Sequence, residues 1–271
     1  MAVITISRGT FGGGKAVSEA LAKHMNYVCV SREVLVKHAA ETFDIPEEKL
    51  RNSILQPPGP LGLNSGQSII NVKYVRAAIL ELGRGNNMVY HGFAAQLLLQ
   101  DIPRLLRVKV IAGMEYRIEH AIKNKGLSRE QAIDHIQEMD KDRAHWARTV
   151  WGVDVNDPAS FDLVINLDNI TIQGAVEIIA KTLEQETFQD RDEDRQTFED
   201  ALTIARVWAA LTRNKPTRTV RIQLECLNGH VTINGDVGSH KMMGAVVSIA
   251  EQVEGVQSVT NTISVGSNWL W

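Results

Sequence analysis

The chain has 271 residues, 44% of them hydrophobic, and a formal net charge of −3. This length suits one large domain or two smaller ones, and the near-neutral charge lacks the basic stripe expected of a nucleic-acid-binding protein. The two cysteines, Cys29 and Cys226, lie far apart in strand-like runs, which favours buried thiols in a reducing compartment over a disulfide framework.

The first residues, MAVITISRGT, carry no basic segment before their short apolar run, so we expect no signal peptide. No stretch approaches the roughly 20 apolar residues that a membrane-spanning helix needs. We therefore expect a cytoplasmic protein without a transmembrane segment.

The first 186 residues alternate between strand-like and helix-like patterns. Apolar, β-branched runs predict strands at 2–7, 27–31, 87–93, 107–113 and 161–171. Helical spacing predicts helices at 14–25, 32–43, 68–85, 117–126, 128–148 and 172–186, the fifth with a capping box formed by Ser128 and Gln131. Residues 53–67 contain three prolines and three glycines and predict a loop. Strands separated by helices imply an α/β fold with a mostly parallel sheet.

A glycine-rich stretch, SRGTFGGGKAVSE, follows the first predicted strand. Gly9, Gly14 and Lys15 match the spacing G-x-x-x-x-G-K, although Ala16 stands where such loops most often carry Ser or Thr. Backbone N–H groups at the start of the following helix bind anionic oxygens, and a lysine adds a mobile cation. The alternative is a glycine turn beside a solvated lysine. We predict a phosphate-binding loop formed by Gly9, Thr10, Gly12, Gly13, Gly14, Lys15, Ala16 and Val17.

The remainder of the chain predicts a second, smaller domain. Acidic and polar residues at 187–196 indicate a linker, and residues 197–266 predict a module in the order α-β-β-α-β. Asn228-Gly229 between two alternating runs predicts a two-residue hairpin. The last residues, 267–271, form an aromatic tail in which Trp269 and Trp271 are expected to dock on this chain or on a partner subunit, which leaves a homo-oligomer open.

Four stretches of the first domain together resemble the cytidylate kinase-like family of P-loop nucleoside monophosphate kinases. They are ITISRGTFGGGKAVSEALAKHM, YVCVSREVL, MVYHGFAAQLLL and the charged region from VKVIAGMEYR to FDLVINLDNIT. The resemblance covers most of residues 1–186. It implies a three-layer P-loop kinase domain that transfers the γ-phosphoryl group of ATP, with Mg²⁺, to a nucleoside monophosphate.

The resemblance also implies roles for single residues. DKDRAHWAR resembles the arginine-bearing lid of the family, which places a lid at about 117–150 and gives Lys15, Arg117, Arg143 and Arg148 catalytic roles. The alternative for these arginines is simple surface exposure, with Asp140 pairing Arg143 along the helix. On the acceptor side, the resemblance implies contacts from Arg32, Glu33 and Phe93.

Three positions depart from the family pattern. Ser31 stands where Asp is common, Phe93 where an arginine is common, and Val17 where a hydroxyl is common, which leaves Mg²⁺ to water or to an acid elsewhere. The eight histidines show no metal-ligand spacing, and His91 at a strand end is expected to be structural. The departures keep open an alternative, a nucleotide-binding sensor that has lost turnover.

The run from VRIQLECLNGHVTINGDV to VQSVTNTISV resembles a BON domain, with Gly229, Val231 and Gly235 at the characteristic places. Such modules are associated with phospholipid or ligand binding in the cell envelope and with protein contacts. For a cytoplasmic chain we expect a regulatory or oligomerising module of unknown ligand; a lipid-associated module is the third alternative.

Overall fold

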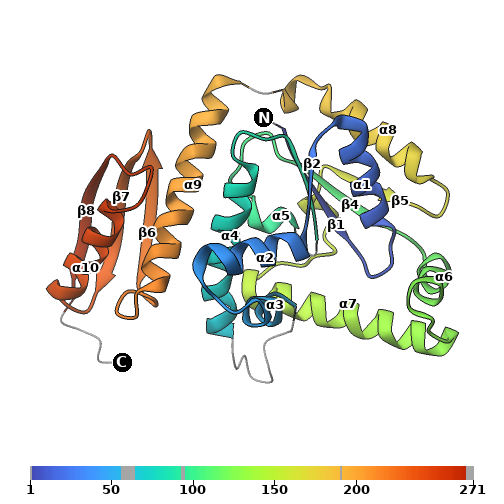
Figure 1. Cartoon of the computed structure of the whole chain (residues 1–271), viewed down its shortest axis with the longest axis horizontal. Helices are drawn as coiled ribbons and strands as arrows, with labels where there is room; N and C mark the ends of the chain where they lie inside the picture. The colour runs from blue at the N-terminus through green and yellow to red at the C-terminus, as the bar shows by residue number, and fades with distance from the viewer. Residues whose placement is uncertain (1, 56–64, 93–94, 190, 267–271) are drawn as a thin grey trace.

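Two β-sheets organise the chain (Figure 1), and the computed structural model describes residues 2–55, 65–92, 95–189 and 191–266. The first sheet contains β1 (Val3–Arg8), β2 (Val28–Ser31), β3 (Met88–Gly92), β4 (Leu106–Ile111) and β5 (Leu163–Asn166). Its strand order is β2-β3-β1-β4-β5, and every neighbouring pair is parallel. The predicted parallel α/β sheet is therefore confirmed.

Helices cover both faces of this sheet. They are α1 (Gly14–Met25), α2 (Arg32–Phe43), α3 (Glu47–Leu55), α4 (Ser65–Gly83), α5 (Ala95–Leu98), α6 (Met114–Lys125), α7 (Arg129–Trp151) and α8 (Ile172–Leu183), with short 3-10 turns η2 (Pro158–Ser160) and η3 (Glu186–Phe188). The predicted capping box of Ser128 and Gln131 starts α7, as expected.

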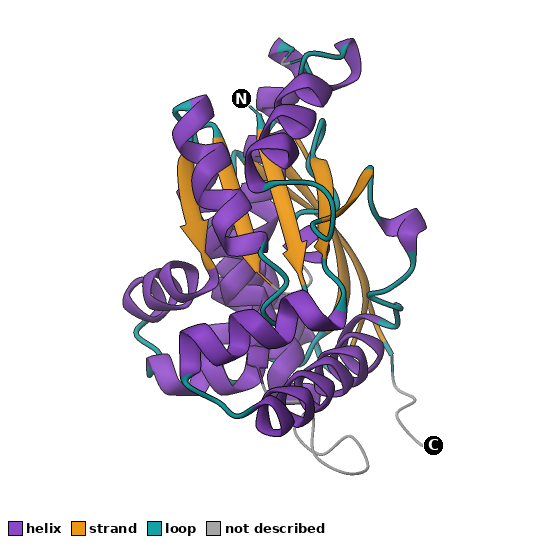
Figure 2. Cartoon of the chain, turned by 90° about the vertical axis from the view of Figure 1, so that its right-hand side faces the viewer, coloured by secondary structure: helices purple, strands orange, loops and turns teal. Residues whose placement is uncertain are grey.

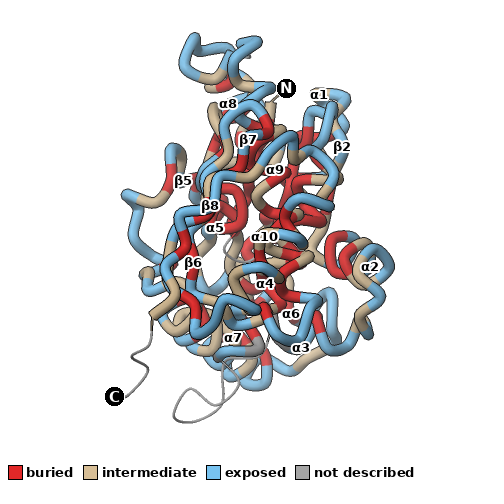
Figure 3. The backbone as a smooth tube through the Cα atoms, turned by 90° about the vertical axis from the view of Figure 1, so that its left-hand side faces the viewer, coloured by how far each residue is buried: buried red, intermediate tan, exposed pale blue. Residues whose placement is uncertain are grey.

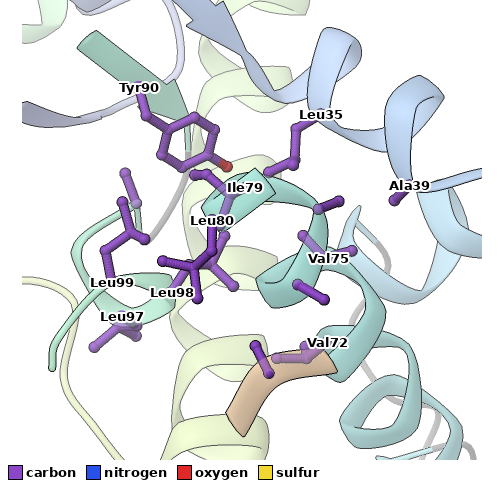
Figure 4. Close-up of a cluster of buried hydrophobic side chains, with 14 of the residues drawn as sticks. Leu35, Ala39, Val72, Val75, Ile79, Leu80, Tyr90, Leu97, Leu98 and Leu99 are labelled. Atoms are coloured by element: carbon purple, nitrogen blue, oxygen red, sulfur yellow. The ribbon is translucent and has the colours of Figure 1, made fainter. Parts of the chain in front are cut away.

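The strand period of two residues divides the core into two layers. Ile4 and Ile6 of β1 pack in a cluster with α1 and α8, whereas Val3 packs on the opposite face with α2 and α4. Figure 4 shows this second cluster, in which Tyr90 of β3 lies above Ile79 and Leu80 of α4. The two clusters give the three-layer arrangement expected of a P-loop kinase domain.

Two local expectations were wrong in part. Residues 53–67 were expected to form a loop, but α3 extends to Leu55 and α4 begins at Ser65; residues 56–64 lie outside the described part of the chain. Pro46 directly precedes α3, and the acidic side chains of its first turn stabilise the helix because they lie at the positive end of its dipole. Cys29 and Cys226 are only partly buried, and they are free thiols.

The second sheet belongs to the module that follows. This module consists of α9 (Asp192–Arg213), β6 (Arg221–Leu227), β7 (His230–Val237), α10 (His240–Glu251) and β8 (Ser258–Val265), which confirms the predicted order α-β-β-α-β. Strand β7 pairs antiparallel with β6 and parallel with β8. Asn228 and Gly229 have φ values of 52° and 77°, the left-handed pair that a two-residue hairpin turn requires.

Helix α9 takes part in both cores. Its residues Phe198, Leu202 and Ala205 pack in the cluster that contains α2 and α4, while Val207 and Leu211 pack with β6 and β7. Figure 1 shows α9 between α4 and the second sheet, and Figure 3 shows buried stretches of α9 behind that sheet. The helix begins at Asp192, inside the range 187–196 that was expected to be a linker.

Polar contacts reinforce this junction. Arg206 of α9 donates to Glu81 of α4 at 2.5 Å, and their side chains are 13% and 27% exposed. Arg84 pairs with Glu199 at 2.9 Å and with Glu254 at 3.3 Å near the surface. The module is thus attached along the length of one helix. Within the described residues, no helix is long and apolar enough to cross a membrane.

Candidate active site

The glycine-rich loop connects the carboxyl end of β1 to α1, at the central strand of the first sheet. Ligands of open α/β sheets bind at this edge. In Figure 2 the strand arrows point toward the end of the molecule where α6 and α7 lie. The loop, the ends of β1 and β3, and helices α6 and α7, which form the predicted lid, therefore meet at one place.

Two glycines of the loop have no room for a side chain. A Cβ on Gly13, whose φ is 77°, would lie 2.4 Å from Leu167 Cδ1 and 2.8 Å from the Tyr116 hydroxyl. A Cβ on Gly14 would lie 2.5 Å from Arg8 Cβ. The start of α1 is therefore a tight backbone cradle, and its unpaired N–H groups suit an anionic ligand.

Two cavities open beside this cradle. The larger, about 660 Å³, is lined by the loop, Lys15, Ala16, Arg32 and residues of α6 and α7. The smaller, about 190 Å³, reaches toward β4 and Arg117. Arg8, Gly12 and Arg143 line both of them. Both cavities thus meet at a pair of arginines from β1 and α7.

The arginines are crowded and desolvated. Burial, and then the nearby Arg32 guanidinium, lowers the pKa of Arg8 below its ordinary value. Burial, and then the positive charge of Arg8, lowers the pKa of Arg143 to about 10. Arg8 Nε is buried and has no hydrogen-bond partner among the described residues. Such a group is satisfied when an anion supplies the acceptor.

His91 ends β3 next to this cluster and is only 2% exposed. Burial, followed by the positive charge of Arg8, lowers the pKa of His91 to about 4. The imidazole is therefore neutral near pH 7, and its buried Nδ1 atom has no partner within the described residues. The expected structural role of His91 stays a prediction.

The lid is attached to the loop through Arg117. Its Nε atom donates to the Thr10 carbonyl at 2.8 Å, and its terminal nitrogen donates to Asp140 at 2.6 Å. The Thr10 hydroxyl also donates to Asp140 at 3.3 Å. Asp140 thus contacts both α6 and the loop.

Phe11 makes a second connection between loop and lid. It packs on the small apolar core of α6 and α7, where Ile118 and Ile136 are buried. Its φ of 56° is unusual for a bulky residue, so packing outweighs the local backbone strain. Loop and lid therefore form one connected unit.

The remaining predicted residues lie at different distances from the cradle. Lys15 is 64% exposed and lies 3.7 Å from Glu19 on the same helix, so its side chain has freedom to reach a ligand. Arg148 pairs with Asp154 at 3.6 Å and is absent from the described lining of both cavities. Gly9 closes the first turn of the loop by accepting from the Gly12 N–H at 3.3 Å.

On the acceptor side, Arg32 lines the larger cavity and pairs with Glu33 at 2.7 Å. Burial opposes ionisation of Glu33, but its own backbone N–H and the Arg32 charge outweigh burial and lower its pKa to about 2. Ser31, where the family commonly has Asp, caps α2 by accepting from the Val34 N–H at 3.2 Å. Phe93 lies outside the described residues.

The loop fits a phosphate group better than a protein-held Mg²⁺ ion. Ala16 carries no hydroxyl, Val17 is fully buried among apolar residues, and the Ser18 hydroxyl donates to the Gly14 carbonyl at 2.7 Å. Asp140 is already engaged by Arg117 and Thr10. In the described part of the chain, no group of three or more His, Cys, Asp or Glu side chains is placed to hold a metal.

Arg8 is the site residue that sequence reasoning missed. The stretch Ile-Ser-Arg before the glycines carried the family resemblance, yet Arg8 itself was given no role, because the predicted strand ended at Ser7 and the predicted phosphate loop began at Gly9. A charged residue closing an otherwise apolar strand, directly before a phosphate loop, was the available signal. Asp140 was recognised only as a partner for Arg143.

Comparisons with known proteins identify the family of each part of the chain. Residues 3–169 match the cytidylate kinase-like family, and residues 199–267 match the BON domain. A cytidylate kinase of Pyrococcus horikoshii is 22% identical over 67% of this chain and 88% of its own length. One from Ignicoccus hospitalis is 25% identical over 68% of this chain and 99% of its own.

A solved structure shares the fold. An uncharacterized protein from Eubacterium ventriosum is 18% identical, with a TM-score of 0.53 over 69% of this chain and all of that chain. The family match spans more than half of the chain and includes the loop, the arginine cluster and the lid helices. The chain therefore belongs to the cytidylate kinase-like family and carries a BON domain after its kinase-like part.

Proposed function

We propose that the chain is an ATP-dependent phosphotransferase of the nucleoside monophosphate kinase type. The observation that carries the proposal is the convergence of Arg8, Arg32, Arg143 and Lys15 on one cavity beside the glycine cradle. Phosphoryl transfer relies mainly on positioning and on positive charge around the transferred group. The relatives named cytidylate kinase support a nucleoside monophosphate as the acceptor.

Each residue has a task in this proposal. The loop amides and Lys15 hold the β- and γ-phosphates, and Arg8 and Arg143 neutralise charge on the transferred group. Arg117 positions the loop against the lid through Thr10 and Asp140. The bond between the γ-phosphorus and its bridging oxygen breaks, a new bond forms to the acceptor oxygen, and ADP leaves.

Mg²⁺ enters this proposal only with the nucleotide. The loop offers it no hydroxyl, so its ligands would be phosphate oxygens and water, and we assign no step to a protein-held ion.

We propose a kinase-like domain at 1–186 and a BON domain at 197–266, with residues 187–196 spanning the start of α9. An ATP-using enzyme fits the cytoplasmic location expected from the sequence.

Acceptor-dependent ADP release tests the proposal. The full chain is incubated with Mg·ATP and a panel of nucleoside monophosphates, and ADP is measured with a coupled assay. We expect release that depends on one class of acceptor, and a loss of at least about 100-fold in Lys15→Ala, a residue expected to contact the transferred group. Lys23→Ala, an exposed lysine on the same helix, is the matched control.

A nucleotide-binding sensor is the second candidate. It is favoured by the burial of Val17 at 0% exposure and by the role of Ser31 as a helix cap, because neither serves turnover. In this case the BON domain transmits the nucleotide state to a partner. ATP binding that requires Lys15, without ADP release for any acceptor, would support the sensor and reject the enzyme.

A further inference from the structure

A third cavity, of about 380 Å³, lies at the junction of the two domains. Val72 and Lys73 of α4 and Trp151 at the end of α7 line it from the kinase-like domain. Ile204 and Trp208 of α9 and Leu224 of β6 line it from the BON domain. Figure 1 shows α9 between α4 and β6 at this place.

This cavity is separate from the phosphate site. None of its described lining residues lines either cavity beside the glycine loop. Its size and its apolar, aromatic walls are typical of small-molecule sites, which bury most of a ligand against hydrophobic side chains. A few polar groups then decide what the ligand must offer.

Two side chains that line this cavity carry hydrogen-bond donors without acceptors among the described residues, and of these two donors only the Lys73 ammonium is available to the cavity. Trp151 Nε1 is buried and has no hydrogen-bond partner among the described residues. Lys73 Nζ lies 3.6 Å from the ring centroid of Trp208, and it forms no hydrogen bond or ion pair within the described part of the chain. A buried indole N–H normally has a partner, and an ammonium away from bulk water favours an anion.

The charge of Lys73 is poorly compensated. Burial lowers the pKa of its ammonium group to about 8. Among the described residues, the one carboxylate that lines the cavity is Asp101, and it pairs with Arg76 at 2.6 Å, so its charge is already neutralised. An anionic group in the cavity would therefore meet one net positive charge and the Lys73 ammonium, which has no acceptor among the described residues.

We propose that this cavity binds a small aromatic monoanion. Its ring lies against Trp208 and the apolar side chains, and its anionic group accepts a hydrogen bond from Lys73 Nζ. Because the ligand contacts α4, α7 and α9 together, its binding favours the docked arrangement of the two domains. Helix α7 also carries Asp140 and Arg143, so the ligand touches the helix that forms the lid.

The test uses a pair of fluorescent probes on the full chain. Anilinonaphthalene sulfonate is an aromatic monoanion, and phenylnaphthylamine has the same rings without the charge. Both are titrated with and without inorganic tripolyphosphate, which under the proposed function occupies the phosphate site. We expect Lys73→Met to weaken sulfonate binding about tenfold and to change phenylnaphthylamine binding less than about twofold.

Further variants separate charge from packing. Lys73→Arg keeps the charge and is expected to retain binding within about threefold. Lys241→Met, an exposed lysine on α10, is the control and should leave both probes unchanged. Circular dichroism verifies that each variant is folded.

Several results would overturn the proposal. They are absence of sulfonate binding, its displacement by tripolyphosphate, or equal weakening of the charged and neutral probes by Lys73→Met. A variant of the aromatic tail, residues 267–271, tests whether the tail itself fills the cavity. If replacing Trp269 and Trp271 by alanine tightened sulfonate binding more than about tenfold, the tail would be the occupant of the cavity; we expect no change.

Discussion

Asp200 connects α9 to the hairpin of the BON domain and allows a quantitative test of that packing. The side chain is 6% exposed and accepts from the backbone N–H groups of Asn228 at 2.8 Å and Gly229 at 2.9 Å. Asp200→Asn keeps the shape, but its NH₂ group must face one of these donors. Hydrogen bonds to a charged group contribute about 1.5–3 kcal/mol each, so the loss of one and the weakening of the other predict a destabilisation of about 2–4 kcal/mol.

The effect depends on pH. Burial opposes ionisation of Asp200, but the N–H groups of Gly229 and Asn228 outweigh burial and hold its pKa below the usual range. Because the pKa of Asp200 is lower in the folded state than in the unfolded state, its ionisation stabilises the fold. This contribution is fully present above about pH 5 and is lost as the pH falls through the folded-state pKa. The difference between Asp200→Asn and the unchanged chain should therefore shrink below about pH 4.

Urea denaturation followed by circular dichroism, at pH 7 and in steps down to pH 3, measures both effects. Asp236→Asn on β7 is the matched control, because Asp236 is exposed in the same sheet and should change stability by less than about 0.5 kcal/mol. Unchanged stability of Asp200→Asn at pH 7, or a difference that stays constant down to pH 3, would refute the reasoning.

Three further substitutions test other parts of the molecule. Gly13→Ala forces a Cβ to within 2.4 Å of Leu167 Cδ1 at a φ of 77°; we expect at least about 2 kcal/mol lower stability in thermal denaturation, with weaker tripolyphosphate binding. Val17→Thr places a hydroxyl in a fully buried apolar site, so it should lower the stability by about 1–2 kcal/mol without raising ADP release. Arg206→Met leaves Glu81 without its partner at the domain junction and should lower the free energy of unfolding by about 1–3 kcal/mol, whereas Arg84→Met near the surface should lower it by less than about 1 kcal/mol. Stability equal to that of the unchanged chain in Gly13→Ala or Arg206→Met, or increased turnover in Val17→Thr, would contradict these expectations.

Features encoded by neighbouring residues were predictable from the sequence. The β-branched run before the glycines gives β1, the helical spacing after them gives α1, and Asn228-Gly229 gives the hairpin. In each case the signal is local, because backbone preference and side-chain periodicity act over a few residues. The order of elements followed from these local signals.

Features that depend on tertiary packing were not predictable in this way. The contacts of Asp140 with Arg117 and Thr10 were not among the expectations, because these two residues are distant from it in sequence. Helix α9 was expected to belong to the second domain, and its burial in both cores depends on how α4 and the second sheet approach it. The hydrogen-bond partners of Asp140 and the packing partners of α9 are determined by the tertiary fold.

Binding of ATP compared with adenosine most directly tests the claim that the cavity beside the glycine loop is a polyphosphate site. Isothermal titration of the full chain should show ATP binding that weakens with salt, no measurable binding of adenosine, and about tenfold weaker ATP binding in Arg8→Gln. Equal affinity for ATP and adenosine, or unchanged ATP binding in Arg8→Gln, would contradict the account.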